Sequence, residues 1–366
     1  MAVVALRTLC HWGGCVLALA LAGCGVWDGD LKHRTTGVPE ALSDGWPIAA
    51  PEDVSVPAAV LQRIQDDYLR EDEQLGTLGF LVARNGQLIY ETYFHDPADR
   101  DRIHHLMSVT KSVTSMIAGI AYTQGWLPDL STPICDILVD PCKGKDKRVY
   151  GIQLRHILTM QSGLDFDNVD FSLEMWVGKP AQPIDYILSK PFYASAGREY
   201  RYRDADPQLM SYVLQQLSGD TEAELAQQYL FAPLGIEDYY WDHGATGETM
   251  GAHGLHMRPR DLLKLGQLML QQGQWQGQQI ISPQWVTDST SAQVPTDDPD
   301  FDYGYLWRTV DEVPGYAAWG AGGQFVLVVP SSSMVLVQIS RPDTNLLPGS
   351  HLSEFVDITR PLWSLP

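Results

Sequence analysis

The chain has 366 residues, of which 45% are hydrophobic and 19% charged, and this balance excludes an intrinsically disordered protein. Its length is sufficient for one large domain or two smaller ones. The net charge of −20 at pH 7 argues against a nucleic-acid partner, because no basic patch offsets the repulsion by phosphates, and we interpret the acidity as a source of solubility.

The first residues have the features of an export signal. Arg7 provides a positive charge, and the apolar run over 13–22 is too short to span a bilayer comfortably. The run ends in Leu-Ala-Gly-Cys at 21–24, which resembles the bacterial lipobox. We therefore expect a signal peptide over 1–23 and a lipid on Cys24, and the following glycine favours an outer-membrane lipoprotein that faces the periplasm or the cell surface. A plain secretory signal with an accidental cysteine is the alternative.

Residues 24–56 are polar, contain prolines and lack periodicity, which predicts a tether between lipid and domain. The segment that begins at Pro57 has apolar residues at helical spacing and predicts an amphipathic helix. A β-hairpin follows, in which 79–84 and 87–94 flank Asn85-Gly86, a dipeptide favoured in type I′ turns.

The next segment, over 106–125, has apolar residues at the spacing of a helix buried in a core. Between Ser108 and Trp126 its only charged residue is Lys111, and an ammonium group on a buried helix is costly to desolvate. Ser108 lies three residues earlier, so the hydroxyl and the amine share one helix face. This S-x-x-K spacing is typical of a serine nucleophile whose proton a lysine helps to remove. We predict that Ser108 and Lys111 are catalytic.

Two cysteines lie outside the signal and the lipidation site. Cys135 and Cys142 are seven residues apart in a loop-like stretch with two prolines. Because an exported protein meets an oxidising environment, we expect a local disulfide between them. No second pair of metal-type ligands accompanies them, and we expect neither a metal ion nor a cofactor.

The range 105–290 is mainly helical and is assigned to a helical domain. Within it, 164–198 is a long aromatic-rich connection, and loops of that length are often lids or binding loops. After residue 294, β-branched and aromatic residues between turn signals indicate strands. Three strands are expected over 303–310, 323–330 and 334–340, followed by a helix over 352–362.

The N-terminal hairpin and the C-terminal strands complete one domain. We predict an α+β fold in which 57–104 and 291–366 form a five-stranded antiparallel sheet flanked by helices. The helical domain over 105–290 is inserted into it, and the Ser108 helix lies at the junction.

A serine–lysine pair also needs a group that transfers protons and donors that hold an oxyanion. Tyr202 follows a glycine turn and precedes a helix, a place where a phenol can project into a cleft. It acts as a base only if cations such as Lys111 stabilise its phenolate, and a core tyrosine is an equally good interpretation. The glycine-rich stretch 318–324 allows close approach of backbone to a ligand. The amides of Ser108 and Ala321 would then form a two-donor oxyanion hole.

Together these motifs resemble the serine β-lactamase-like superfamily, which includes class C β-lactamases, penicillin-binding esterases and 6-aminohexanoate-dimer hydrolases. Ser-Val-Thr-Lys-Ser at 108–112 matches its S-x-x-K-S motif, and Tyr-Arg-Asp at 202–204 lies where relatives have Tyr-x-Asn or a looser tyrosine motif. The segments 154–164 and 254–266 are similar to helical signatures of the family, the second to the oligomer-hydrolase branch. The resemblance covers about 55–365 and implies a β-lactamase/transpeptidase-like fold and an acyl-enzyme mechanism.

Two positions depart from the family pattern. Asp204 replaces the asparagine of many relatives and adds a carboxylate near Lys111 and Tyr202, which favours a charged lysine. The third motif, Lys-Thr-Gly or His-x-Gly in penicillin-recognising members, is Ala-Trp-Gly at 318–320, without the cation or imidazole that meets a β-lactam carboxylate. We therefore expect a carboxylic ester or a short linear amide as the substrate. The residues expected to line the site are Asp204, His253, Trp319, Gly320 and Gly322.

Two other hypotheses remain open: a β-lactamase or D,D-peptidase acting on penicillin-like or peptidoglycan substrates, and a non-catalytic envelope-binding lipoprotein. His253 is as readily a structural histidine as a cleft residue, and we treat His104 and His105 as background. The expected partners are a small ester or amide and, through the lipid alone, a membrane. The sequence does not indicate the oligomeric state or the acyl and leaving groups.

Overall fold

The described part of the chain excludes both termini and three internal stretches. The predicted signal peptide and the lipidation site at Cys24 lie outside it, as does part of the connection over 164–198. None of the helices in the described ranges combines the length and the apolar character that crossing a bilayer requires. The structure, a computed structural model, describes residues 37–166, 182–310, 313–341 and 350–365, without the side chains of 68–75 and 350–351.

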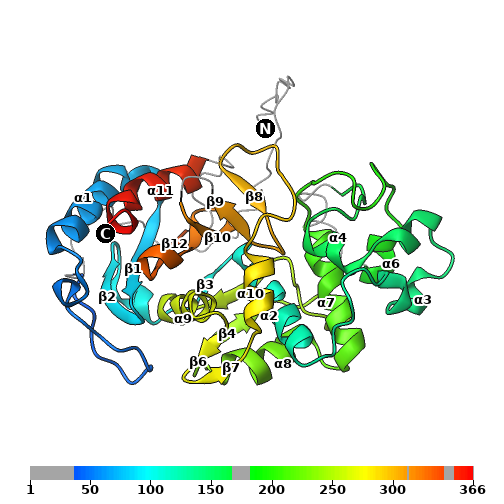
Figure 1. Cartoon of the computed structure of the whole chain (residues 1–366), viewed down its shortest axis with the longest axis horizontal. Coiled ribbons are helices and arrows are strands. Elements are labelled where there is room, and N and C mark those ends of the chain that lie inside the picture. The colour runs from blue at the N-terminus through cyan, green and yellow to red at the C-terminus, as the bar shows by residue number, and fades with distance from the viewer. Residues whose placement is uncertain (1–36, 167–181, 311–312, 342–349, 366) are drawn as a thin grey trace, which may run out of the picture.

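Among the described residues, seven antiparallel strands form one sheet that joins the two ends of the folded chain (Figure 1). Its order is β2-β1-β12-β11-β10-β9-β8, so the N-terminal hairpin lies beside the last strand. This arrangement confirms the predicted α+β fold with an antiparallel sheet flanked by helices. The strands are β1 (Thr77–Arg84), β2 (Gln87–Tyr93), β8 (Phe301–Tyr303), β9 (Arg308–Val310), β10 (Gly315–Gly320), β11 (Gln324–Val329) and β12 (Met334–Ser340).

The predicted number of five strands is wrong. The strand expected over 303–310 is two strands, because Leu306 adopts a left-handed φ of 60° and the amide of Gly304 donates to Trp307 O at 2.8 Å. The other additional strand is β10, which the prediction does not count. Its glycines and alanines have low strand propensity, but pairing with β9 on one side and β11 on the other outweighs that preference.

Helices cover both faces of the sheet. On one face, α1 (Ala58–Leu75) and α11 (Ser350–Trp363) lie side by side, and Phe355 stacks on Phe325 with 4.8 Å between ring centroids (Figure 1). On the other face lies α9 (Pro259–Leu270), where a Cβ on Gly266 would be only 2.5 Å from Val335. Because α9 packs on the sheet, it does not belong to the helical domain that the sequence predicts over 105–290.

Residues 37–56 also pack against the sheet, although the sequence predicts a tether over 24–56. Ile48 forms a bridge with β2, and the indole of Trp46 donates to Arg260 O at 3.0 Å. Trp46 is itself buried. The tether prediction is therefore wrong for 37–56, where scattered apolar side chains are buried without forming a periodic element.

The helix α2 (Val109–Thr123) lies between the sheet and a group of helices on the right of Figure 1. It packs against β10 and β11 on one side and against α7, α8 and α10 on the other. The other α-helices among the described residues are α3 (Val139–Cys142), α4 (Leu154–Leu158), α6 (Pro183–Leu188), α7 (Ala205–Ser218), α8 (Glu222–Ala226) and α10 (Pro283–Ser289). The short strands are β3 (His104–His105), β4 (Tyr239–Trp241), β5 (Leu255–Met257), β6 (Gln274–Trp275) and β7 (Gln278–Gln279).

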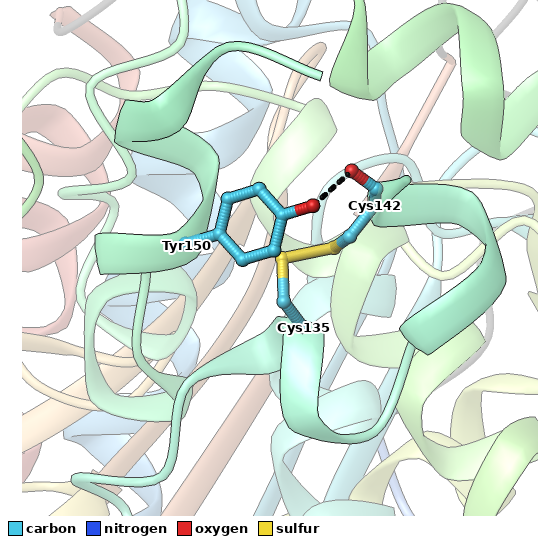
Figure 2. The surroundings of a disulfide bond; sticks show 3 residues. All are labelled: Cys135, Cys142 and Tyr150. Atoms are coloured by element: carbon cyan, nitrogen blue, oxygen red, sulfur yellow. Dashed lines mark hydrogen bonds between the residues drawn. A yellow bond between two sulfur atoms is a disulfide. The ribbon is translucent and has the colours of Figure 1, made fainter. Parts of the chain in front are cut away.

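Cys135 and Cys142 form a disulfide in the helical region (Figure 2). Their Cα atoms are 5.6 Å apart, and Cys142 is the last residue of α3. The hydroxyl of Tyr150 donates to Cys142 O at 2.9 Å and lies over the bridge. The disulfide thus holds a stretch of mostly short turns to a single geometry.

Candidate active site

Ser108 is the N-cap residue of α2 and follows a strained position. Met107 has a φ of 50°, in the left-handed region, and such non-glycine residues cost about 1–3 kcal/mol and cluster at functional sites. The side chain of Ser108 makes no capping hydrogen bond to the helix. Its Oγ instead accepts a hydrogen bond from Lys111 Nζ at 2.8 Å. The turn therefore presents the hydroxyl to the lysine one helical turn further along.

Lys111 is almost completely buried, with 1% of its surface exposed. Besides Ser108 Oγ, its Nζ donates to Ala252 O at 2.8 Å and lies 2.7 Å from Asp204 Oδ1. Burial lowers the pKa of Lys111, but the charges of Asp204 and Tyr202 outweigh burial, so the pKa is raised above its ordinary value. Lys111 is therefore an ammonium ion at neutral pH, and the three oxygen atoms named above occupy its N–H donors.

Asp204 reaches Lys111 from the start of α7. It is the N-cap residue of that helix, but its carboxylate makes no capping hydrogen bond. Asp204 is 7% exposed, so its ion pair with Lys111 is shielded from water and from salt.

Two cations lie close to the ring of Tyr202. Lys111 Nζ is 5.0 Å from the centre of its ring, and the guanidinium carbon of Arg308 is 5.2 Å from the same centre. Arg308 lies on β9, and its Nη1 donates to Trp319 O at 3.3 Å. Burial lowers the pKa of Arg308, but neighbouring tyrosines, Tyr202 foremost, outweigh burial and raise the pKa above its ordinary value.

Arg308 is not among the site residues predicted from the sequence. A usable signal was present, because the arginine is isolated in a run of aromatic and apolar strand residues. An arginine in such a run can lie at the surface end of a strand or be buried inside the protein. The packing of β9 beside β10 shows that Arg308 is buried.

The turn between β10 and β11 lies close to the start of α2. A Cβ on Gly320 would be 2.4 Å from Leu106 O, so the strand touches the segment that leads into Ser108. Gly322 and Gly323 have φ of 77° and 87°, which only glycine adopts readily. Two side chains of β12 hold the turn in place, because Gly323 O accepts from Gln338 Nε2 at 3.0 Å and from Ser340 Oγ at 3.1 Å. Between Gly320 and these glycines stands Ala321, which is exposed; its role as oxyanion donor stays a prediction.

His253 is buried next to the lysine–aspartate pair. Burial lowers the pKa of His253 to about 4; the charge of Asp204 opposes this shift and that of Lys111 adds to it. The imidazole is therefore neutral at pH 7. Its neighbour Ala252 provides the carbonyl that accepts from Lys111, so this loop helps to position the lysine.

A second buried carboxyl group near the start of α7 was also missed. Asp206 is completely buried, and burial raises the pKa of Asp206 to about 7, although the hydroxyl and amide of Ser162 donate to it. Asp206 is two residues from Asp204, and the two carboxyl groups differ in their partners. Asp204 faces Lys111, whereas Asp206 joins α7 to Ser162 in the segment that follows α4.

A cavity of about 610 Å³ lies elsewhere, lined by residues from 42–45, 232–237 and 275–276 together with Arg258. None of the predicted site residues lines it. We therefore locate the site by the chemistry around Ser108 and Lys111 and not by the size of this cavity.

Replacing Gly320 with alanine should impair the site without unfolding the sheet. The new Cβ would meet Leu106 O, so the strand or the turn before Ser108 must shift. A misplacement of about 1 Å can reduce a rate about 100-fold, and we expect a loss of that order in kcat/KM for p-nitrophenyl butyrate. Gly151→Ala, which has open space around it, is the control. Equal activity of the two variants would mean that β10 does not act on Ser108.

Comparison with known proteins gives concordant findings. The family model described as Beta-lactamase matches residues 61–345. The 6-aminohexanoate-dimer hydrolase of Paenarthrobacter ureafaciens is 26% identical over 333 residues, which cover 83% of each chain.

Solved structures share the fold. A Bacillus anthracis protein assigned as a 6-aminohexanoate-dimer hydrolase has a TM-score of 0.71 at 20% identity, over 81% of this chain and 82% of its own. EstCE1, a hydrolase with promiscuous acyltransferase activity, has a TM-score of 0.67 at 17% identity, over 84% of this chain and 99% of its own. A class C beta-lactamase mutant has a TM-score of 0.65 at 15% identity, over 83% and 98%.

Proposed function

Because this chain belongs to the beta-lactamase family and is a serine hydrolase, we propose that Ser108 is its nucleophile and that it cleaves a carboxylic ester or a short linear amide. One observation carries the proposal: the buried Lys111 ammonium donates to Ser108 Oγ at 2.8 Å while Asp204 balances its charge. A lysine held in this way has no solvent-facing role. It supports the S-x-x-K chemistry that the sequence predicts.

In the proposed mechanism, Lys111 first gives up its extra proton to solvent and becomes a neutral amine. Ser108 Oγ then attacks the substrate carbonyl and passes its proton to the Lys111–Tyr202 pair. The amides of Ser108 and Ala321 stabilise the oxyanion, and the helix dipole of α2 adds to this effect. The pair returns the proton to the leaving alcohol or amine, which leaves an acyl-enzyme. Water, deprotonated by the same pair, then releases the acid and restores Ser108.

The residues around Trp319 favour an ester or a linear amide over a β-lactam as the substrate. The cation or imidazole that penicillin-recognising relatives place on this strand is replaced here by Ala318. Arg308 is nearby, but it is 7% exposed and lies under the ring of Trp319, 4.7 Å from its centre. It is therefore badly placed to bind a β-lactam carboxylate. The Paenarthrobacter ureafaciens relative, by its name, hydrolyses a 6-aminohexanoate dimer, and this supports a linear amide as one substrate class.

The experiment compares three substrates with the purified protein: p-nitrophenyl butyrate, a linear 6-aminohexanoate dimer and a chromogenic cephalosporin. We expect turnover of the ester or the linear amide to exceed that of the cephalosporin. Rapid cephalosporin turnover without ester cleavage would instead favour a β-lactamase or D,D-peptidase. No turnover, together with no labelling by a fluorophosphonate probe, would favour the non-catalytic binding protein.

The pH dependence of hydrolysis should move when Asp204 is replaced by asparagine. Asp204 raises the pKa of Lys111, so replacing its carboxylate with a neutral amide should lower that pKa. The neutral amine then forms at lower pH, and the acid limb of kcat/KM shifts to lower pH. The control is Asp129→Asn at an exposed position, which should leave the profile unchanged. An unchanged limb in Asp204→Asn would show that Lys111 is not the titrating group.

We further propose that the chain is exported and anchored to the outer membrane by a lipid on Cys24. The lipobox-like sequence supports this location, and the Cys135–Cys142 disulfide is compatible with an oxidising compartment. Cells that produce the protein should incorporate labelled palmitate into it, and Cys24→Ser should abolish the label whereas Cys10→Ser should not. An unlabelled wild-type protein in the medium would indicate a plain secretory signal.

A further inference from the structure

A cluster of metal-ligating side chains lies on the small sheet beside the active site. In the described part of the chain this sheet has the order β3-β5-β4. His105 of β3 pairs directly with His256 of β5, and their ring centres are 4.5 Å apart. Asp242 follows β4, and its amide donates to Gly254 O at 2.9 Å. Three adjacent strands therefore bring two imidazoles and one carboxylate to one place.

The separations suit a common metal ion. The ligand atoms of His105, Asp242 and His256 all lie within 4.8 Å of one another, and His256 Nε2 is 3.7 Å from Asp242 Oδ2. Around Zn²⁺, nitrogen and oxygen ligands lie about 2.0–2.2 Å from the ion, which puts tetrahedral ligand atoms about 3.4 Å from each other. The pair of His256 Nε2 and Asp242 Oδ2 is already close to this spacing. Small side-chain rotations of the third residue would complete the triangle.

The backbone around the cluster is tightly constrained. Gly254 has a φ of 97°, and a Cβ there would lie 2.7 Å from the Cβ of Asp242, so glycine is needed for the carboxylate to approach β5. Leu106 N donates to Leu255 O at 2.8 Å, which fixes β3 against β5 next to the paired histidines. Ligands held on paired strands lose little freedom on binding, and such preorganisation favours affinity.

We propose that His105, Asp242 and His256 form a binding site for a divalent transition-metal ion of the Zn²⁺ type, with water at the remaining position. Two imidazoles and a carboxylate favour Zn²⁺ or a similar ion over Mg²⁺ and Ca²⁺, which prefer oxygen ligands. This site is separate from the Ser108 chemistry and does not rest on the proposed function.

The place of the site in the chain indicates its role. His105 is followed by Leu106, by the strained Met107 and then by Ser108, so an ion that joins β3 to β5 also holds the turn into α2. The same β5 begins next to the loop whose Ala252 O accepts from Lys111. The bound ion is thus expected to stabilise the folded state and the geometry of both entry segments, without touching the substrate.

The test is a Zn²⁺ titration of the full chain, purified without reductant so that Cys135 and Cys142 stay paired, and treated with a chelator beforehand. We expect saturable binding of about one equivalent and a Zn²⁺-dependent rise in Tm, with no such response to Mg²⁺. His105→Asn and His256→Asn should each weaken binding at least about tenfold, whereas His243→Asn, one residue beyond Asp242, should bind as wild type.

A second measurement covers the case in which a variant does not fold. X-ray absorption at the zinc edge of the wild-type protein should show nitrogen and oxygen neighbours at about 2.0–2.2 Å. A shell containing sulfur would place the ion on cysteines and overturn the proposal. Absence of saturable binding, or full affinity in folded His105→Asn and His256→Asn, would overturn it as well.

Discussion

Replacing Ser108 with alanine is expected to reduce kcat/KM for the best ester or amide substrate by about 10³-fold or more. The variant loses the atom that forms the acyl-enzyme, and removal of the nucleophile in serine hydrolases leaves only the contribution of binding and of the oxyanion hole. Lys111 keeps its contacts with Ala252 O and Asp204, so the fold around it should persist. A fluorophosphonate probe should add its mass to the peptide that contains Ser108, and the label should vanish in Ser108→Ala.

A matched control comes from the same helix. Ser115 is buried on α2, and its hydroxyl has no hydrogen-bond partner among the described residues. Ser115→Ala should therefore keep both activity and labelling. Substantial hydrolysis by Ser108→Ala, or labelling at another serine, would show that the nucleophile lies elsewhere.

Replacing Lys111 with methionine should affect activity and stability together. Loss of a general acid–base group costs about 10²–10⁴-fold in rate, and Met has a similar length without the charge. The same change leaves the carboxylate of Asp204 buried without its cation, and breaking a buried pair in this way costs about 3–5 kcal/mol of the free energy of unfolding. We expect a low Tm and a nearly inactive protein.

The double variant Lys111→Met/Asp204→Asn separates the two effects. It removes the buried negative charge, so most of the lost stability should return, whereas the activity should stay low because the proton-transfer group is absent. Urea unfolding gives the free energies, and stopped assays with p-nitrophenyl butyrate give kcat/KM. Recovery of activity with stability would mean that Lys111 serves only the fold.

The local patterns of the sequence predicted the elements on which the site is built. The Asn85-Gly86 hairpin is present as β1 and β2, and the helix that carries Lys111 is α2. Both depend on short-range spacing of apolar residues and on turn chemistry, which a single sequence displays directly. The family resemblance, which the match over 61–345 confirms, rests on the same kind of local motif.

Elements that depend on tertiary pairing were predicted less well. β10 consists of glycine, alanine and aromatic residues, and its position between β9 and β11 decides that it is a strand. The apolar residues in 37–56 show no helix or strand periodicity, because single side chains are buried separately against β2 and α9. Contacts of this kind involve residues far apart in the chain, so no local pattern reports them.

By itself, the sequence determined the α+β class, the family and the spacing of Ser108 and Lys111, because each of these depends on local patterns of neighbouring residues. The family resemblance had already placed Asp204 near Lys111, and the structure gives their separation of 2.7 Å. Only the tertiary structure decided that Arg308 lies against Tyr202 and that His105 contacts His256. These side-chain contacts depend on which strands and helices pack together. That packing is set by burial of the whole core and not by the residues on either side of each group.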